Sequence, residues 1–322
     1  MVLYNVKIYM KNKKVTALVL FSGGLDSILA VKILERQNIE VTALAFESYF
    51  FDTNQAEVSA EKNNIKLIVE NISEIHWGIT KNPHFGHGKN LNPCIDCHAL
   101  MFKEAWKIKE KEGFDVLATG EVLGQRPFSQ NTEAFKKTEN YLDMEGKILR
   151  PLSGKILLET VYEKEGLVDR NQLEDIRGRS RKQQLQLAKD FDVEYFPTPA
   201  GGCCLTEKEF SVKLEKLMNF CDDPVKSDFE LLRIGRHSWE DVESRMVHFV
   251  VGRNQEENEK IISLKEECDL IVEKDKGTGP TVLIRGFDEN LKDLAIEKAR
   301  EFIWKYSKND LEDWKELEIV VK

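Results

Sequence analysis

The chain has 322 residues, of which 41% are hydrophobic and 32% are charged, and its formal net charge is −9. This length exceeds what one ordinary hydrophobic core occupies, so two domains are expected. No apolar run reaches the roughly 20 residues of a membrane span, and the charged N-terminus lacks the apolar centre of a signal peptide. We therefore expect a cytoplasmic protein with no membrane partner, and the acidic balance argues against a nonspecific nucleic-acid coat.

The first half of the chain alternates β-rich apolar runs with stretches of helical periodicity. This alternation predicts an α/β fold with a doubly wound parallel sheet. Gly113 closes one predicted helix as a C-cap. The predicted strands are 15–21, 41–46 and 65–71, and 115–121 is predicted to be a strand that runs into a functional loop. The predicted helices are 28–37, 54–63 and 99–113.

The second half of the chain has a different rhythm. The segment 171–190 is predicted to be helical, and the Pro- and Gly-rich FPTPAGGCCLTE marks a domain edge. Further on, FELLRIGRH, RMVHFVVG, DLIVEK and TVLIRG read as strands, and 254–267 and 289–306 as helices. This pattern predicts a second, smaller α+β domain. The expected division is a catalytic domain at 1–190, a cysteine-bearing loop and linker at 191–227, the α+β domain at 228–308 and a tail at 309–322.

The stretch SGGLDS joins the first predicted strand to a helix. Its glycines let a ligand approach the backbone, and free N–H groups at a helix start favour an anion. Asp26 is expected to hold Mg²⁺ or to orient a nucleotide. By glycine content alone an ordinary strand–helix turn is equally expected, and the missing G-K-[ST] ending argues against a kinase or GTPase. The residues expected to contact the ligand are Ser22, Gly23, Gly24, Asp26 and Ser27.

Six cysteines are present, and Cys94 and Cys97 form a C-x-x-C pair within CIDCH. In a reducing compartment such pairs more often bind metal or perform chemistry than form disulfides. Attachment of c-type haem is disfavoured because the chain carries no export signal. A structural zinc site needs four ligands, and Cys203 and Cys204 are the clearest further donors.

A catalytic sulfur site is the third interpretation of these cysteines. A C-x-x-C pair with one distant cysteine supplies three ligands to a four-iron cluster and leaves one iron open for a labile sulfide. The residues alone do not distinguish this arrangement from zinc. Cys221 and Cys268 are expected to be small buried hydrophobic residues.

Several motifs together resemble the PP-loop ATP pyrophosphatases of the tRNA thiouridine synthase type. They are SGGLDS, NPCIDC, DVLATGEVLGQRPFSQ, LRPL and PAGGCCLT, spread over roughly residues 15–215. GEVLGQ and RPL are similar to 4-thiouridine synthase, whereas NPCIDC sits where 2-thiouridylases place a catalytic cysteine. The resemblance implies an adenine nucleotide alpha hydrolase-like fold that cleaves ATP between its α- and β-phosphates. It also implies nucleotide contacts by Gly120 and Gln125.

The three-cysteine pattern resembles the cluster-dependent thiolases. Only one of two adjacent residues on an extended chain faces a given side. Cys203 is favoured over Cys204 because Gly201 and Gly202 make its backbone adaptable. Zinc remains the alternative to a [4Fe–4S] cluster. The resemblance implies that the catalytic residues are Cys94, Cys97, Cys203 and Asp26, with the three cysteines as metal ligands and Cys204 as the alternative third ligand.

The C-terminal part resembles the NFACT-R type of RNA-binding module through FELLRIGRH, HFVVGRNQEENEK and GPTVLIRG. Residues 228–322 contain 16 Lys and Arg against 23 Asp and Glu, a net charge of −7. Any RNA contact must therefore use a local cluster, for which the expected residues are Arg233, Arg236, Arg253 and Arg285. A second basic run, at 177–182, is either a solvated helix face or a phosphate contact.

The combined resemblance implies ATP-dependent tRNA thiolation. A uracil carbonyl oxygen attacks the α-phosphate, pyrophosphate leaves, and sulfide then displaces AMP, while Mg²⁺ offsets phosphate charge. The expected partners are tRNA and either sulfide or a sulfur-donor protein, and a homodimer is left open. The motifs favour 4-thiouridine at position 8 over 2-thiouridine at position 34. They are also compatible with an amidotransferase or sulfur transferase acting on a small molecule, and with a non-enzymatic, zinc-stabilised RNA-binding protein.

Overall fold

The computed structural model describes residues 14–126, 129–198, 203–307 and 312–322. The chain forms two compact units, Met1–Cys203 and Cys204–Lys322. Within the described ranges, no helix combines the length and the apolar character that crossing a membrane requires.

The first unit is built on a four-stranded parallel sheet with the strand order β3-β2-β1-β4. Strand β1 pairs in parallel with both β2 and β4, so that Leu20 lies opposite Leu44 on one side and Thr119 on the other. The strands are β1 (Thr16–Leu20), β2 (Glu40–Glu47), β3 (Leu67–Asn71) and β4 (Val116–Thr119).

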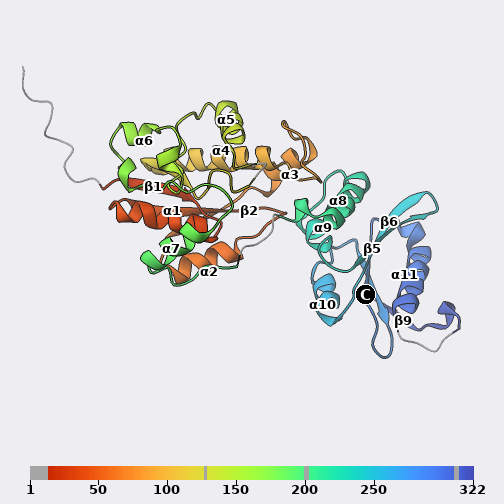
Figure 1. The fold of residues 1–322 in the computed structure, drawn as a ribbon. Coiled ribbons are helices and arrows are strands. Elements are labelled where there is room, and N and C mark those ends of the chain that lie inside the picture. The colour runs from red at the N-terminus through yellow and green to blue at the C-terminus, as the bar shows by residue number, and fades with distance from the viewer. Residues whose placement is uncertain (1–13, 127–128, 199–202, 308–311) are drawn as a thin grey trace, which may run out of the picture. The chain divides into compact units, whose positions relative to one another are not determined.

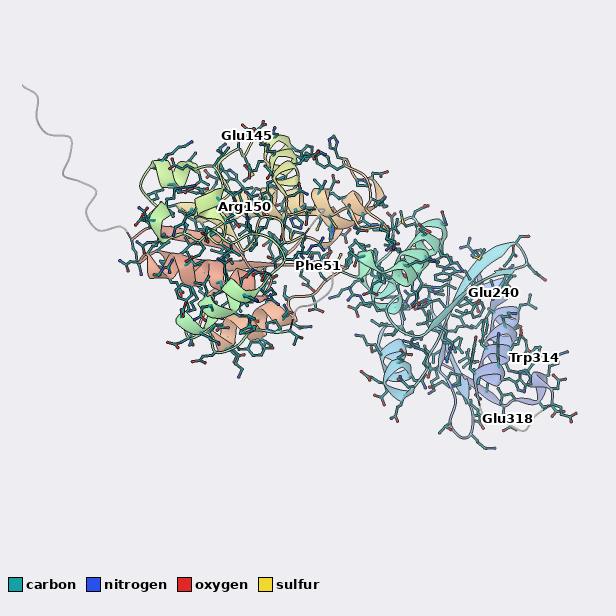
Figure 2. The ribbon with its side chains drawn as sticks, in the orientation of Figure 1. Phe51, Glu145, Arg150, Glu240, Trp314 and Glu318 are labelled. Atoms are coloured by element: carbon teal, nitrogen blue, oxygen red, sulfur yellow. The ribbon has the colours of Figure 1, made fainter. Side chains whose placement is uncertain are left out.

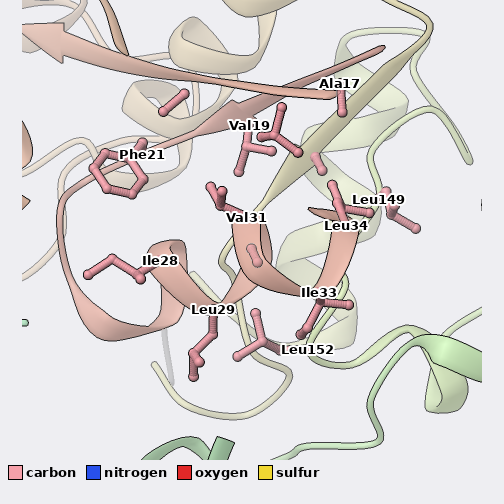
Figure 3. Close-up of a cluster of buried hydrophobic side chains, with 14 of the residues drawn as sticks. Ala17, Val19, Phe21, Ile28, Leu29, Val31, Ile33, Leu34, Leu149 and Leu152 are labelled. Atoms are coloured by element: carbon pink, nitrogen blue, oxygen red, sulfur yellow. The ribbon is translucent and has the colours of Figure 1, made fainter. Parts of the chain in front are cut away.

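Helices cover both faces of this sheet, because β1 is apolar on both sides. Ala17 and Val19 pack with α1, α2 and α7, and Figure 3 shows the α1 side chains of this cluster beside β1. Leu18 packs on the other face with α4. The predicted doubly wound α/β fold is therefore confirmed. The helices of this unit are α1 (Leu25–Arg36), α2 (Asn54–Lys62), α3 (Ser73–Lys81), α4 (Cys94–Glu112), α5 (Thr132–Tyr141), α6 (Val161–Lys164) and α7 (Lys182–Asp190).

The strand order places a topological switch point between β1 and β4. The connection from β1 leads to β2 on one side of it, whereas β4 lies on the other side. In open α/β sheets, ligands bind beyond the carboxyl ends of the strands at such a point. The loops that follow β1 and β4 are therefore where this fold positions a site.

The second unit contains a five-stranded sheet with the order β5-β6-β8-β7-β9, antiparallel throughout. Helix α11 packs on one face, and α9 and α10 contribute to the core on the other face (Figure 1). The predicted smaller α+β fold is confirmed. The elements are α8 (Lys208–Phe220), α9 (Lys226–Leu231), β5 (Arg236–Val242), β6 (Arg245–Val251), α10 (Gln255–Ser263), β7 (Leu270–Lys274), β8 (Val282–Arg285), α11 (Lys292–Tyr306) and β9 (Ile319–Val321).

Some predicted elements differ from the structure. Within 171–190 only α7 and the short 3₁₀ turn Arg170–Gln172 are helical. The part between them hydrogen-bonds to distant loops, and Gly178 has a φ of +82°, so tertiary contacts override the local helical pattern there. FELLRIGRH reads as a strand in the sequence, but its first residues complete α9 and β5 begins only at Arg236. Helix α4 begins at Cys94, five residues before the predicted start at 99. Helix α8 lies in the segment expected to be loop and linker.

Candidate functional site

The glycine loop is held in place by α2. Gly23 has a φ of +74°, and a Cβ there would lie 2.5 Å from the carbonyl oxygen of Gln55. Only glycine avoids both the unfavourable dihedral and the clash. Ser59 Oγ donates to Gly23 O at 2.8 Å, and Gln55 Nε2 donates to Ser22 O at 3.2 Å. The loop conformation is thus determined by its packing against α2 and not only by its own sequence.

The first turn of α1 has no side-chain cap within the described ranges. Its N-cap is Gly24, which has no side chain to accept from the first N–H groups, and none of the described side chains caps it. Ser27 Oγ donates to Gly24 O at 2.8 Å, which turns the hydroxyl back onto the loop. Uncapped N–H groups at the positive end of a helix dipole form an anion site.

The loop after β4 completes this region. A Cβ at Gly120 would lie 2.6 Å from the backbone N of Ser27, so the two loops touch through glycine. Gln125 Nε2 donates to Asp26 Oδ2 at 2.8 Å. Asp26 Oδ1 and Gln125 Oε1 are buried and have no hydrogen-bond partner in the described part of the chain. Such unpartnered oxygens are unusual in a folded protein and suit a cation or a ligand donor.

Cys94 and Cys97 lie in the first turn of α4. Between them, the buried carboxylate of Asp96 accepts from the backbone N of His84 at 2.9 Å and of Phe85 at 3.0 Å. These bonds tie the preceding loop to the helix start. Both cysteines are half-buried, so the turn presents them from a fixed backbone.

Cys203 lies within electrostatic reach of this turn. The pKa of Cys97 is raised well above its usual value, first by desolvation and then by negative charge on Cys203, Cys94 and Asp96. Cys203, which is more than a hundred residues from the C-x-x-C pair in sequence, is therefore near Cys97 in the first unit. Gly201 and Gly202, on which the preference for Cys203 rested, lie outside the described residues.

The other three cysteines, Cys204, Cys221 and Cys268, belong to the second unit. Cys204 opens a short 3₁₀ helix of the second unit, and its Sγ lies 4.0 Å from Arg233 Nη2. Cys268 is exposed and Cys221 is only half-buried. The expectation that Cys221 and Cys268 are buried hydrophobic residues is wrong, because Cys221 is the C-cap of α8 and Cys268 lies in the turn just before β7, where both remain near solvent.

A buried ionic network links the cysteine helix to the loop after β4. Glu121 accepts from His98 Nδ1 at 3.0 Å and from Arg150 Nε at 3.0 Å. Arg150, labelled in Figure 2, also donates to Glu139 at 2.6 Å and stacks over the Phe135 ring at 3.8 Å. Glu121 and Arg150 are 6% and 5% exposed. At that burial, charges persist only when paired.

The network keeps Glu121 ionised. Burial alone would raise its pKa, but the positive charge of Arg150 and the hydrogen bond from His98 outweigh burial and lower the pKa overall. Arg150 reaches this position because Leu149 pairs alongside β4. The motifs gave no role to Arg150 or His98. The usable signal was an arginine directly after the apolar residues Ile148 and Leu149, because an arginine buried beside such residues requires a carboxylate partner.

The cysteine turn and the glycine loop are therefore linked, through Glu121 and Gly120, at the carboxyl ends of the parallel strands. His98 follows Cys97 and bonds to Glu121, while the adjacent Gly120 touches Ser27. By donor type, three thiols fit zinc or an iron–sulfur cluster. In the described ranges, however, no group of three or more His, Cys, Asp or Glu is arranged to hold a metal ion.

Of the arginines expected to contact RNA, Arg285 is buried inside the second unit. Its guanidinium donates to Asp228 Oδ1 at 2.6 Å and to Asp269 Oδ1 at 2.9 Å. An arginine with two buried carboxylate partners cannot reach a phosphate. The expectation for Arg285 is therefore wrong.

The other three arginines lie nearer the surface. Arg253 pairs with Glu257, lowering the pKa of that carboxyl to about 2 through its hydrogen bond. Arg236 lies over the Tyr306 ring at 4.6 Å. Arg253 is thus partly neutralised within the fold, and Arg236 and Arg233 are exposed.

Two family models match the chain. Residues 12–157 match the thiamine biosynthesis protein (ThiI) family, a range that includes the glycine loop, the cysteine pair and Arg150. The first unit carries a ThiI-family domain. Residues 235–322 match the NFACT protein RNA binding domain. The resemblances found in the sequence are confirmed at this level, and Cys203 lies beyond the matched range of the ThiI-family domain.

Curated relatives of two kinds are similar to the chain. A tRNA-specific 2-thiouridylase MnmA of Pseudomonas fluorescens (strain Pf0-1) is 24% identical over 88% of this chain and 75% of its own length. A probable tRNA sulfurtransferase of Thermoanaerobacter sp. (strain X514) is 32% identical, but over 43% of this chain and 37% of its own length. The chain thus spans little more than a third of that sulfurtransferase.

Among solved structures, one titled as a 4-thiouridine synthetase–RNA complex with bound ATP aligns with the chain. It is 19% identical, with a TM-score of 0.34, over 55% of this chain and 51% of that one.

Proposed function

We propose that the protein is a tRNA sulfurtransferase that uses ATP to replace a uridine oxygen with sulfur. The observation that carries the proposal is the meeting of the glycine loop and the cysteine turn through Gly120, Glu121 and His98. An enzyme of this kind needs an activating nucleotide and a sulfur site at one place. The match to tRNA sulfurtransferases and the RNA binding domain support tRNA as the substrate.

The first step activates the uracil carbonyl. The N–H groups at the start of α1 receive the phosphates of ATP, and the free oxygens of Asp26 and Gln125 fit Mg²⁺, which prefers oxygen ligands. The carbonyl oxygen attacks the α-phosphorus, the bond to the bridging oxygen breaks, and pyrophosphate leaves. The role of the protein here is to position the reactants and to stabilise the developing charge.

The second step exchanges oxygen for sulfur. Hydrosulfide sulfur adds to the activated carbon, the carbon–oxygen bond breaks, AMP leaves, and the sulfur proton passes to solvent. Cys94, Cys97 and Cys203 are the residues that would hold a [4Fe–4S] cluster, with zinc as the alternative. A cluster with three protein ligands supplies an open iron for sulfide.

We further propose 4-thiouridine at position 8 as the product. The match to the ThiI family supports this choice, together with the GEVLGQ and RPL motifs that lie inside or beside the ionic network. A second candidate, 2-thiouridine at position 34, is favoured by the greater coverage of the 2-thiouridylases. Mass spectrometry of tRNA nucleosides distinguishes the two products directly.

The test combines metal analysis with turnover. Protein purified without oxygen should contain iron and acid-labile sulfide, and should thiolate tRNA in the presence of ATP and sulfide. Cys97→Ser and Cys203→Ser should abolish thiolation, whereas Cys204→Ser and Cys268→Ser should retain it. Pyrophosphate release that does not require tRNA would favour a small-molecule substrate. Stoichiometric zinc without pyrophosphate release would overturn the enzyme proposal.

A further inference from the structure

Four cationic residues are concentrated just before and at the start of α7. We call Arg177, Arg179, Arg181 and Lys182 the basic segment. Three of them, Arg177, Arg179 and Lys182, are exposed. None of the four forms an ion pair with any residue in the described ranges of the chain. Arg181 is half-buried, and its Nε is a buried donor for which the described residues offer no acceptor.

The basic segment is fixed against the candidate nucleotide site. Ser153 Oγ donates to Ile176 O at 2.6 Å and accepts from the backbone N of Leu123 at 3.0 Å. Gly178 N then donates to Leu123 O at 2.7 Å. Leu123 lies two residues before Gln125, which contacts Asp26. Backbone bonds thus hold the cations beside the loop that follows β4.

Folding stability does not explain this arrangement. The positive end of a helix dipole disfavours cations, yet α7 begins with Arg181 as its N-cap and Lys182 in its first turn. None of the described side chains caps this helix start with a hydrogen bond. The positive charges of the basic segment and the uncapped N–H groups of α7 therefore have no negative group of the described chain to neutralise them. A bound anion would offset the repulsion and satisfy the donors together.

We propose that the basic segment binds phosphates of the RNA backbone next to the nucleotide site. The substrate would then be held by the first unit itself, through residues beyond the range matched by the ThiI family, in addition to any contact by the RNA binding domain. The charge distribution favours this assignment, since residues 228–322 carry a net charge of −7 and Arg285 and Arg253 are paired internally. The inference rests on the proposed function and specifies where its RNA substrate is held.

The experiment measures binding of a fluorescently labelled tRNA transcript to the full chain by anisotropy over a series of KCl concentrations. The test variant combines Arg177→Gln, Arg179→Gln and Lys182→Gln. Each lost phosphate contact should make the slope of log K against log [KCl] shallower by roughly 0.7 to 0.9, or about 2 to 3 for the whole variant. Affinity for ATP should stay at the wild-type value, and the melting temperature should not fall, because the removed cations do not stabilise the start of α7.

The control variant removes three positive charges elsewhere in the first unit: Lys62→Gln, Lys66→Gln and Lys111→Gln. These lysines are exposed. They lie near the carboxyl ends of α2 and α4 or just before β3, and therefore at the amino ends of the parallel strands, away from the candidate site. The control should keep the wild-type salt slope. An equal loss of slope in both variants would indicate a general charge effect and would overturn the proposal.

Two further outcomes would also overturn it. If the wild type binds tRNA and the test variant keeps the same slope, the segment does not contact RNA, although the proposed function stands. If the test variant instead loses affinity for ATP with its RNA slope unchanged, the segment serves the phosphates of the nucleotide. Absence of any tRNA binding by the wild type would remove the substrate of the proposed function as well.

Discussion

The two units differ in whether the basic residues considered as RNA contacts are paired within the fold. In the second unit, Arg285 and Arg253 are paired with carboxylates of the same fold. In the first unit, Arg177, Arg179 and Lys182 are exposed and, among the described residues, have no ion-pair partner. A basic side chain is available for a ligand only where the fold supplies no carboxylate. Net charge and sequence motifs do not show which basic side chains are available for a ligand, whereas the ion pairs of the folded structure do.

Both units also contain a buried arginine held by two carboxylates, but the two networks have different neighbours. Arg285 joins β8 to Asp228 of α9 and to Asp269 just before β7. Arg150 joins Glu121 and Glu139, and Glu121 continues to His98 beside the cysteine turn. The Arg285 network joins a helix to a sheet. The Arg150 network also positions residues of the candidate site.

The largest expected effect tests the structural role of Arg285. Arg285→Met leaves two buried carboxylates unpaired, so the second unit should lose about 3 to 5 kcal/mol of unfolding free energy. Hydrogen exchange of β6 and β8 measures the loss within that unit. The exposed Arg245→Met is the control and should change stability by less than about 0.5 kcal/mol. Normal protection combined with lost RNA binding would instead make Arg285 an RNA contact.

Glu121→Gln tests the corresponding network of the first unit. It removes the charge that Arg150 and His98 share, and should cost about 2 to 3 kcal/mol at neutral pH. The folded-state pKa of Glu121 is lowered from its ordinary value of 4.5. Its stabilisation is therefore present above that pH and is lost as the pH falls through the lower folded pKa.

The difference between wild type and Glu121→Gln should accordingly shrink in acid. Urea unfolding at a series of pH values measures it. Glu133→Gln is a suitable control because that carboxylate pairs with Lys137 at an exposed site, where such pairs contribute little. A difference that stays constant down to the lowest pH at which the protein folds would show that the charge of Glu121 is not what stabilises the network.

The smallest expected effect concerns the loop conformation at Gly23. Gly23→Ala adds a Cβ at a positive φ and against Gln55 O, and should cost about 1 to 3 kcal/mol and weaken ATP binding. Gly78→Ala is the matched control. Its Cβ meets no atom within 4 Å outside its own helix backbone, so it should stabilise α3 by about 0.5 to 1 kcal/mol. Calorimetric titration with ATP would contradict the assignment if the Gly23→Ala variant bound as tightly as wild type.

The sequence by itself determined the elements whose signal is local. The apolar runs of β1, β2 and β4 and the periodicity of α1 and α4 identify the doubly wound sheet, because burial on one or both faces imposes a repeat on each segment. The glycine loop and the C-x-x-C pair were also visible as sequence motifs, although their expected functions came from the family resemblance. Their placement at one edge of the sheet follows from parallel strands, whose carboxyl ends lie together.

Tertiary structure decided which polar groups find partners. Arg150 and Glu121 are 29 residues apart, and Arg285 and Asp228 are 57 apart, so no local pattern could pair the first two or withdraw Arg285 from an RNA surface. The irregular backbone before α7 likewise depends on bonds from Ser153 and Leu123. Periodicity reports how one segment is buried. The pairing of charges and the orientation of a functional loop depend on contacts between segments, which only the folded chain brings together.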